Sequence, residues 1–145
     1  MPKTFDMAEE IITQIPGYET GKVHRVNADD EIGASFLIAK MVSDLRTRWS
    51  TGVAVLSLDG HKDAIEAIVP SDGSIAKAVI LDQKNPDVNV IDRKLRGLIH
   101  RQFIRAAIIS PSGALKGSPD FVSNALERLA ASEKIPVILV DYPTI

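Results

Sequence analysis

The sequence predicts a single α/β domain, residues 1–145, in which a mixed central sheet is flanked by helices. Three observations lead to this prediction. The nearly continuous apolar runs at 53–58 and 137–140 are typical of strands covered on both faces. Apolar residues at helical spacing alternate with such runs through the second half of the chain. A strand–helix–strand–helix–strand ending implies parallel neighbours joined by right-handed crossovers.

The first third of the chain is predicted to be mainly helical. Apolar spacing indicates a helix at 5–15, which Pro16-Gly17 ends, and a polar connection at 21–28 leaves room for a strand at 22–26. A second helix is expected over 30–49, capped by Asp29 or Asp30. We therefore divide the domain into an N-terminal helix and connection, 1–28, and a core, 30–141.

A β-meander is expected next. The buried strand at 53–58 is followed by the turn Asp59-Gly60 and a strand at 63–69. The turn signal Pro70-Ser71-Asp72-Gly73 precedes a strand at 75–82, so the last two strands are predicted to form a hairpin.

The remaining elements alternate. A basic amphipathic helix is predicted at 90–103, a buried strand at 106–109 and a glycine-containing loop at 110–117. Ser118-Pro119-Asp120 gives the next helix a cap, a first-turn proline and an early acid. Pro136 ends that helix before the final strand at 137–140.

Composition narrows the function classes. The chain has 145 residues and no cysteine, which excludes disulfides and thiolate metal sites. No apolar run approaches the roughly 20 residues that span a bilayer, and the polar, acidic first ten residues do not resemble a targeting segment. We therefore expect a cytoplasmic protein without a membrane partner. The net charge of −2 gives no overall attraction to nucleic acid.

The most informative charged residues surround the predicted hairpin. Asp82 and Lys84 are two apart at a strand end, so their side chains share a face. If the hairpin closes at 71–74, Asp63 falls opposite residue 81 or 82. Asp63 and Asp82 would then share a Mg²⁺ ion, for which Mn²⁺ is the alternative, and Lys84 would steer the attacking water.

Several motifs resemble a known family. The stretch Asp59-Gly60-His61-Lys62-Asp63 is similar to the Asp-Gly-Gly-Ile-Asp pattern of Mrr-type restriction endonucleases, with His61-Lys62 in place of Gly-Ile. The strand ending at 79–84 is similar to the Glu-x-Lys or Gln-x-Lys strand of the PD-(D/E)XK nuclease superfamily. The strand, loop, helix and strand at 107–141 resemble the end of that domain.

This resemblance implies a restriction-endonuclease-like fold and a metal-dependent DNA endonuclease. It makes Asp63 and Asp82 the metal ligands and Lys84 the catalytic lysine. The family's helix glutamate would be Glu9, Glu10 or Glu31, and we favour Glu31 because its helix leads directly into the meander.

The basic helix is the predicted nucleic-acid contact. A local basic face can bind phosphates even when the whole chain is acidic. The predicted DNA-binding residues are Arg93, Lys94, Arg96, His100, Arg101 and Arg105. The three histidines show no zinc-ligand spacing, and Trp49 is interpreted as a packing residue at a helix end.

Two other functions are compatible with the sequence. One is an inactive nuclease-fold module that binds nucleic acid or supports assembly. The other is a profilin-like dimerisation or sensor subunit without enzymatic activity, which would use a mainly antiparallel sheet. A homodimer is compatible with each.

Overall fold

The computed structural model describes residues 18–69 and 76–143. The helix predicted at 5–15 and the turn predicted at 70–73 lie outside the described residues. The described strands are β1 (Val23–Asn27), β2 (Gly52–Ser57), β3 (Ala78–Asp82), β4 (Ile104–Ser110) and β5 (Val137–Asp141). The described helices are α2 (Glu31–Thr47), α3 (Lys62–Ile68), α4 (Val88–Gln102) and α5 (Pro119–Glu133), with a 3-10 turn, η1 (Ser112–Ala114).

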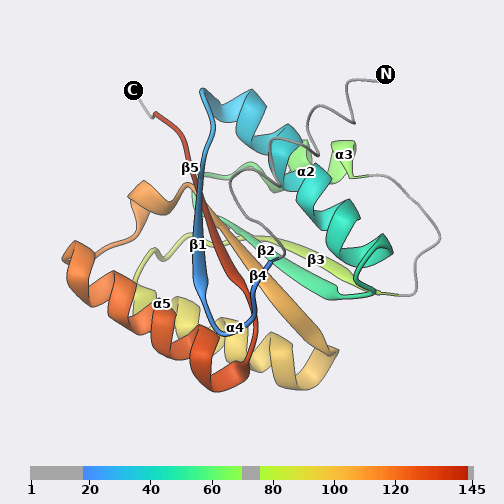
Figure 1. The fold of residues 1–145 in the computed structure, drawn as a ribbon. Coiled ribbons are helices and arrows are strands. Elements are labelled where there is room, and N and C mark those ends of the chain that lie inside the picture. Colours follow the sequence, from blue (N-terminus) through green and yellow to red (C-terminus); the bar gives the residue numbers. More distant parts are fainter. Residues whose placement is uncertain (1–17, 70–75, 144–145) are drawn as a thin grey trace.

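The five described strands form one parallel sheet in the order β1-β5-β4-β2-β3. Helices α2 and α3 cover one face of the sheet and α4 and α5 cover the other, which gives three layers (Figure 1). The α/β class is therefore confirmed, whereas the mixed sheet is wrong for the described strands. The parallel arrangement also argues against the profilin-like alternative.

The strand predicted at 63–69 is the helix α3. Periodicity separates helix from strand poorly in so short a segment, and Ile65 is the buried residue of this helix. Asp63 lies in its first turn, where an acidic side chain is favoured. A helix between β2 and β3 lets the two strands pair in parallel, with Ser57 beside Asp82, so the predicted hairpin is also wrong.

Local signals placed the other elements close to their predicted positions. Asp30 caps α2 by accepting a hydrogen bond from the Gly33 amide at 2.7 Å. Ser118 caps α5 by accepting one from the Phe121 amide at 3.2 Å. The optional strand at 22–26 corresponds to β1.

Two apolar cores hold the layers together. Strand β2 is buried along its whole length, and β4 is exposed only at Arg105, as expected for central strands. Their side chains alternate between the core under α2 and α3 and the core under α4 and α5. None of the described helices is long and apolar enough to cross a membrane.

This topology determines where a ligand is expected. From β2 the chain passes through α3, over one face of the sheet, to β3. From β4, the neighbour of β2, it passes through α5, over the opposite face, to β5, in the opposite direction along the strand order. Doubly wound parallel sheets bind ligands at such a switch point, beyond the carboxyl ends of the strands. A ligand is therefore expected at the loops that follow β2 and β4.

Candidate functional site at the carboxyl edge of the sheet

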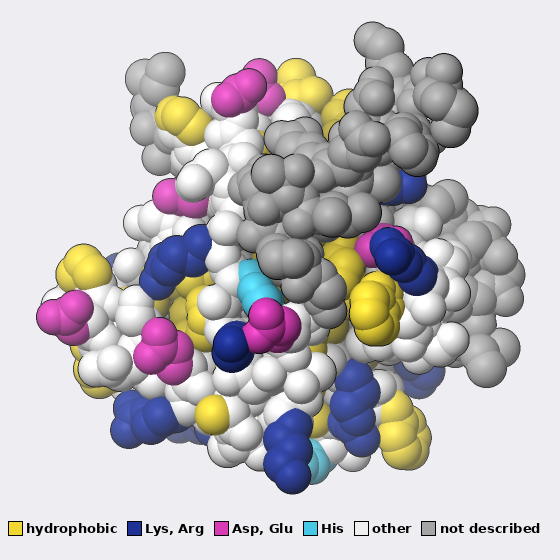
Figure 2. All heavy atoms as spheres, viewed as in Figure 1, with side chains coloured by type: hydrophobic (Ala, Val, Ile, Leu, Met, Phe, Trp, Pro, Cys, Tyr) yellow, Lys and Arg dark blue, Asp and Glu magenta, His cyan; other side chains and the backbone are white. Residues whose placement is uncertain are grey.

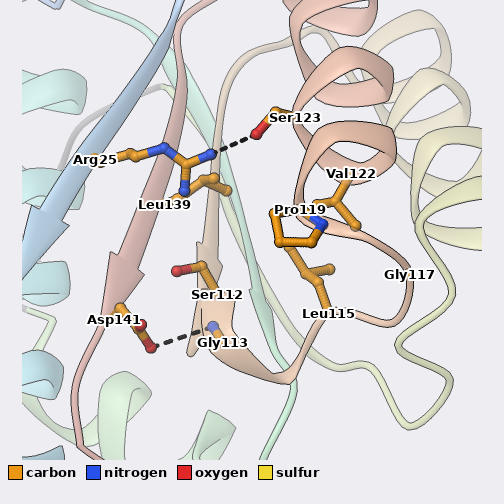
Figure 3. A pocket seen from close by; sticks show the side chains of 10 residues that line it. All are labelled: Arg25, Ser112, Gly113, Leu115, Gly117, Pro119, Val122, Ser123, Leu139 and Asp141. Atoms are coloured by element: carbon orange, nitrogen blue, oxygen red, sulfur yellow. Dashed lines mark hydrogen bonds between the residues drawn. The ribbon is translucent and has the colours of Figure 1, made fainter.

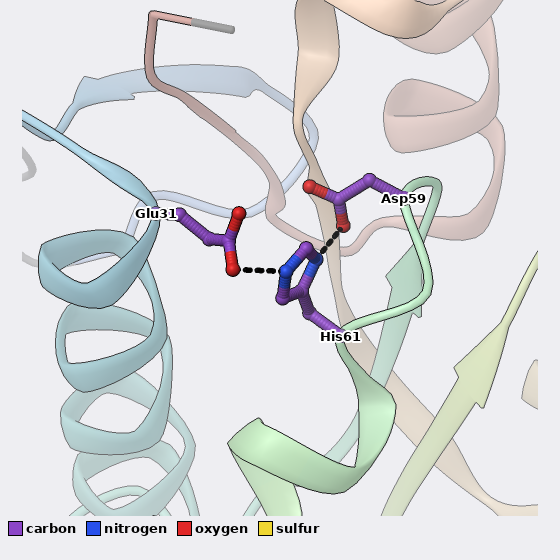
Figure 4. A group of neighbouring side chains, drawn as sticks. All are labelled: Glu31, Asp59 and His61. Carbon is purple, nitrogen blue, oxygen red and sulfur yellow. Dashed lines mark ion pairs between the residues drawn. The ribbon is translucent and has the colours of Figure 1, made fainter.

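A histidine lies between two carboxylates at this edge (Figure 4). His61 and Asp59 belong to the loop between β2 and α3, and Glu31 opens α2. The separation between His61 Nδ1 and Asp59 Oδ1 is 2.6 Å, and His61 Nε2 contacts Glu31 Oε1. One ligand atom from each residue lies within 4.8 Å of the others, so the three can surround a single ion.

The end of β2 holds the loop in place. Ser57 is buried, donates its hydroxyl to Asp59 Oδ1 at 3.1 Å and accepts the His61 amide at 2.8 Å. The next amide, that of Leu58, donates to the Ser110 carbonyl of β4 at 2.8 Å. Gly60 adopts φ +82°, a conformation that residues with a side chain rarely adopt. These contacts fix Asp59 and His61 relative to the sheet.

Glu31 reaches the site from a distant part of the sequence. Strand β1 runs beside β5, and the Ala28 amide after it donates to the Asp141 carbonyl at 2.8 Å. The Asp30 cap then starts α2, so that Glu31 lies in its first turn. The Glu31 side chain is 52% exposed and therefore has more freedom to move than Asp59, at 23%.

The donor atoms suit a divalent cation. His61 Nδ1 is buried, and its close approach to Asp59 does not have the direction of a hydrogen bond. One imidazole nitrogen and two carboxylates form a mixed donor set that suits Mn²⁺ or Zn²⁺ better than Mg²⁺, which prefers oxygen ligands alone.

The two carboxylates also change the acidity of His61. Burial alone would lower its pKa, because it disfavours the charged imidazolium. The close contact and charge of Asp59, followed by the charge of Glu31, outweigh burial and raise the pKa of His61 above its ordinary value. The imidazolium is therefore the favoured form of this side chain in the metal-free protein over a wider pH range than usual.

The raised pKa predicts a pH-dependent stability. The stability that protonated His61 contributes to the folded protein is fully present below the ordinary histidine pKa of 6.5. It is lost as the pH rises through the raised pKa of His61 in the folded state. With chelator present, we expect the Tm to fall as the pH rises from the ordinary histidine pKa of 6.5 through the raised folded-state pKa of His61. His61→Gln should flatten this part of the Tm–pH curve relative to the wild-type protein. An unaltered curve for His61→Gln would contradict the assignment.

The catalytic residues predicted from sequence lie at the same edge but in another arrangement. Asp82 ends β3, and its Oδ1 accepts a hydrogen bond from the Lys62 amide at 3.1 Å. Asp63 is exposed on α3, and Lys84 is exposed just beyond β3. A shared ion between Asp63 and Asp82 stays a prediction, but the hairpin from which it was derived does not exist. Glu31, the favoured helix glutamate, does belong to the three-residue cluster.

Sequence reasoning missed His61 and Asp59. Asp59 is predicted to lie in a turn between two strands, and the three histidines show no zinc-ligand spacing, so the sequence prediction does not include these two ligands. The useful signal was Asp59-Gly60-His61 directly after the nearly all-apolar strand at 53–58, together with Asp29-Asp30-Glu31 shortly after the optional strand at 22–26. Carboxyl ends of parallel strands meet at one edge, and this brings the two acidic segments together.

A polar hollow lies near this edge, between β1, β5 and the start of α5 (Figure 3). It encloses about 270 Å³. Arg25 projects from β1 and donates to Ser123 Oγ at 2.8 Å, while Asp141 ends β5 and accepts the Gly113 amide at 3.2 Å. A cation and an anion thus border the same hollow, so it has no single charge preference.

The predicted DNA-binding residues fall into two groups. Arg96 pairs with Asp92 at 3.1 Å and Glu133 at 3.0 Å, and His100 pairs with Glu133 at 3.0 Å. The Arg105 guanidinium donates to the carbonyls of Ile99 and Ile104. By contrast, a shallow hollow on the outer side of α4 is lined by Arg93, Lys94, Gly97, Leu98, Arg101 and Gln102.

Helix α4 leads from the carboxyl end of β3 back to the start of β4. Arg101 and Arg105 therefore lie toward the edge of the sheet where the amino ends of the strands meet (the amino edge), away from His61. Only the start of α4 lies at the same edge as the cluster. Nucleic-acid binding by this helix stays a prediction.

Comparison with known protein families and with curated proteins gave no match for the chain. The resemblance to PD-(D/E)XK nucleases therefore rests on the short motifs alone. The site geometry carries the functional argument.

Proposed function

We propose that this protein is a metal-dependent phosphoester hydrolase whose divalent ion is held by Glu31, Asp59 and His61. The observation that supports this most directly is the meeting of one imidazole and two carboxylates beside the switch point of the sheet. A divalent ion there would polarise a phosphate oxygen and acidify a water molecule.

The charge of the edge supports a role for a cation. Asp82, Asp59 and Asp141 end or follow three of the five strands, and Asp29, Asp30 and Glu31 follow a fourth. Such an edge repels a phosphate group unless a cation offsets the negative charge. Lys84, exposed just beyond β3, is available to contact a bound phosphate.

The proposal keeps the chemistry expected from sequence and changes the ligands. The restriction-endonuclease-like fold expected from sequence contains a β-meander. Here β2 and β3 are parallel and are connected by α3, so the proposal does not depend on that family. DNA remains the first substrate to test, because Arg93, Lys94 and Arg101 line an outward hollow on α4.

The test begins with the wild-type protein. Calorimetric titration should show one ion bound per chain, with Mn²⁺ or Zn²⁺ tighter than Mg²⁺. Hydrolysis of bis(p-nitrophenyl) phosphate and nicking of plasmid DNA should require the metal and stop with EDTA. Failure of all three ions to bind would refute the proposal.

A non-catalytic role is the second candidate. His61 contacts carboxylates on both sides, so the same three residues can act as a clamp between α2 and the β2–α3 loop. In that case the domain binds a metal or a partner without hydrolysing phosphoesters. Stoichiometric metal binding without turnover of either substrate would favour this candidate.

A further inference from the structure

The two edges of the sheet differ in charge. Helices α2, α4 and α5 end at the amino edge, and cations are favoured at helix C-termini. The acids there are already paired: Glu19 with Lys22 at 2.7 Å, and Glu133 with Arg96 and His100. Among the residues that the structure describes, Arg101, Arg105 and Lys134 at this edge have no ion pair. The amino edge is therefore a region of uncompensated positive charge.

A hollow of about 450 Å³ opens at this edge. Trp49 lines it and is 47% exposed, with Arg105, Lys134, Thr51 and the Lys22-paired Glu19 around it. The ring of Tyr18 meets that of Trp49 edge-on, with centroids 6.3 Å apart and planes at 78°. Trp49 is thus held by Tyr18, and the Arg48 guanidinium lies over its ring, 5.9 Å from the centroid, while about half of the Trp49 surface remains exposed.

A second aromatic residue is exposed at the same edge. Phe103 follows α4 directly, lies between Arg101 and Arg105 in the sequence, and is 74% exposed. Its φ of 58° is left-handed, a conformation in which glycine is the usual residue at a helix end. Neither helix termination nor core packing accounts for a large apolar side chain here. Figure 2 shows Lys and Arg side chains near exposed hydrophobic ones at its lower right, over the end of α4 in Figure 1.

From these features we propose that the amino edge binds single-stranded nucleic acid. Arg101, Arg105 and Lys134 contact the phosphates, and Trp49 and Phe103 stack with unpaired bases. Exposed aromatics beside cations are how non-specific single-strand binders work, whereas a duplex keeps its base faces inside. This site lies at the edge opposite His61, and its binding needs no metal.

Trp49 provides a direct readout because it is the only tryptophan in the chain. In EDTA, titration of the wild-type protein with dT₂₀ or rU₂₀ should quench its fluorescence. A duplex of the same length should bind more weakly and quench less. Equal binding and quenching by the duplex would overturn the proposal, whatever the outcome of the metal experiments.

Matched charge variants locate the binding surface. For single strands, each lost phosphate contact lowers the slope of log K against log salt by about 0.7. The double variant Arg101→Gln/Lys134→Gln should therefore lower it by about 1.4. The control Lys40→Gln/Lys116→Gln removes the same charge from α2 and from the loop before α5, away from the amino edge, and should leave the slope unchanged. An equal loss in the control would overturn the assignment to the amino edge.

Phe103→Gly separates binding from folding. Glycine suits the left-handed backbone, so the Tm should stay the same or rise. Affinity for dT₂₀ should nevertheless fall by about tenfold, because one base loses its aromatic partner. Unchanged affinity would exclude Phe103 from the interface.

Discussion

His61→Ala is expected to reduce metal-dependent hydrolysis by at least about 100-fold, the upper end of what the loss of a supporting residue costs at a metal site. The substitution removes the one nitrogen donor of the cluster and leaves two carboxylates whose mutual repulsion is then less compensated. Metal affinity, measured by calorimetry, should fall in parallel. The circular dichroism spectrum should not change, because the backbone contacts of the loop come from Ser57 and Leu58.

Companion variants test the two ligand sets against each other. Asp59→Asn should behave like His61→Ala, while Glu31→Gln should have a smaller effect because its side chain is half exposed. Asp63→Asn and Asp82→Asn probe the ligands predicted from sequence. If these two abolish metal binding while His61→Ala retains it, the ion sits between α3 and β3 and our assignment is incorrect.

Ile108→Ala is expected to lower the free energy of unfolding by about 2–5 kcal/mol, the range for truncating a large aliphatic side chain in a packed core. Ile108 is fully buried in the centre of β4, between Val55 of β2 and Ile138 of β5. Truncation leaves a cavity that the strands on both sides cannot close without shifting the sheet.

Ile32→Ala is the matched control for this substitution. It removes the same atoms from α2, where Ile32 is 68% exposed, and should change the free energy of unfolding by no more than about 0.5 kcal/mol. Urea titrations of both variants at one pH provide the comparison. Equal effects of the two substitutions would mean that Ile32 is not exposed on α2 or that Ile108 is not buried in β4.

The predictable part of the fold depended on local signals. Apolar runs marked β2 and β5, and the caps Asp30 and Ser118 marked the starts of α2 and α5, because a helix start is set by neighbouring residues. The prediction of a strand at 63–69 was wrong because strand alternation and helical spacing are indistinguishable over so few residues. That error turned a parallel crossover into a hairpin and so changed the predicted sheet from parallel to mixed.

The candidate site was only partly predictable. Glu31 was identified, although through a family resemblance rather than through its contacts. The sequence does not show that His61 and Asp59 lie close to Glu31. Their proximity depends on the strand order, in which β5 and β4 separate β1 from β2. That strand order is set by which helix packs on which face, and no local pattern records it.

The pairing of β1 with β5 has a consequence for biosynthesis. Among the described strands, β5 is the sole neighbour of β1, yet the ribosome makes it last, after every other described element. The nascent chain must therefore carry β1 unpaired until Val137–Asp141 has left the exit tunnel. A product interrupted after α5 would present β1 as an open edge, which is the kind of strand that recruits other chains into aggregates.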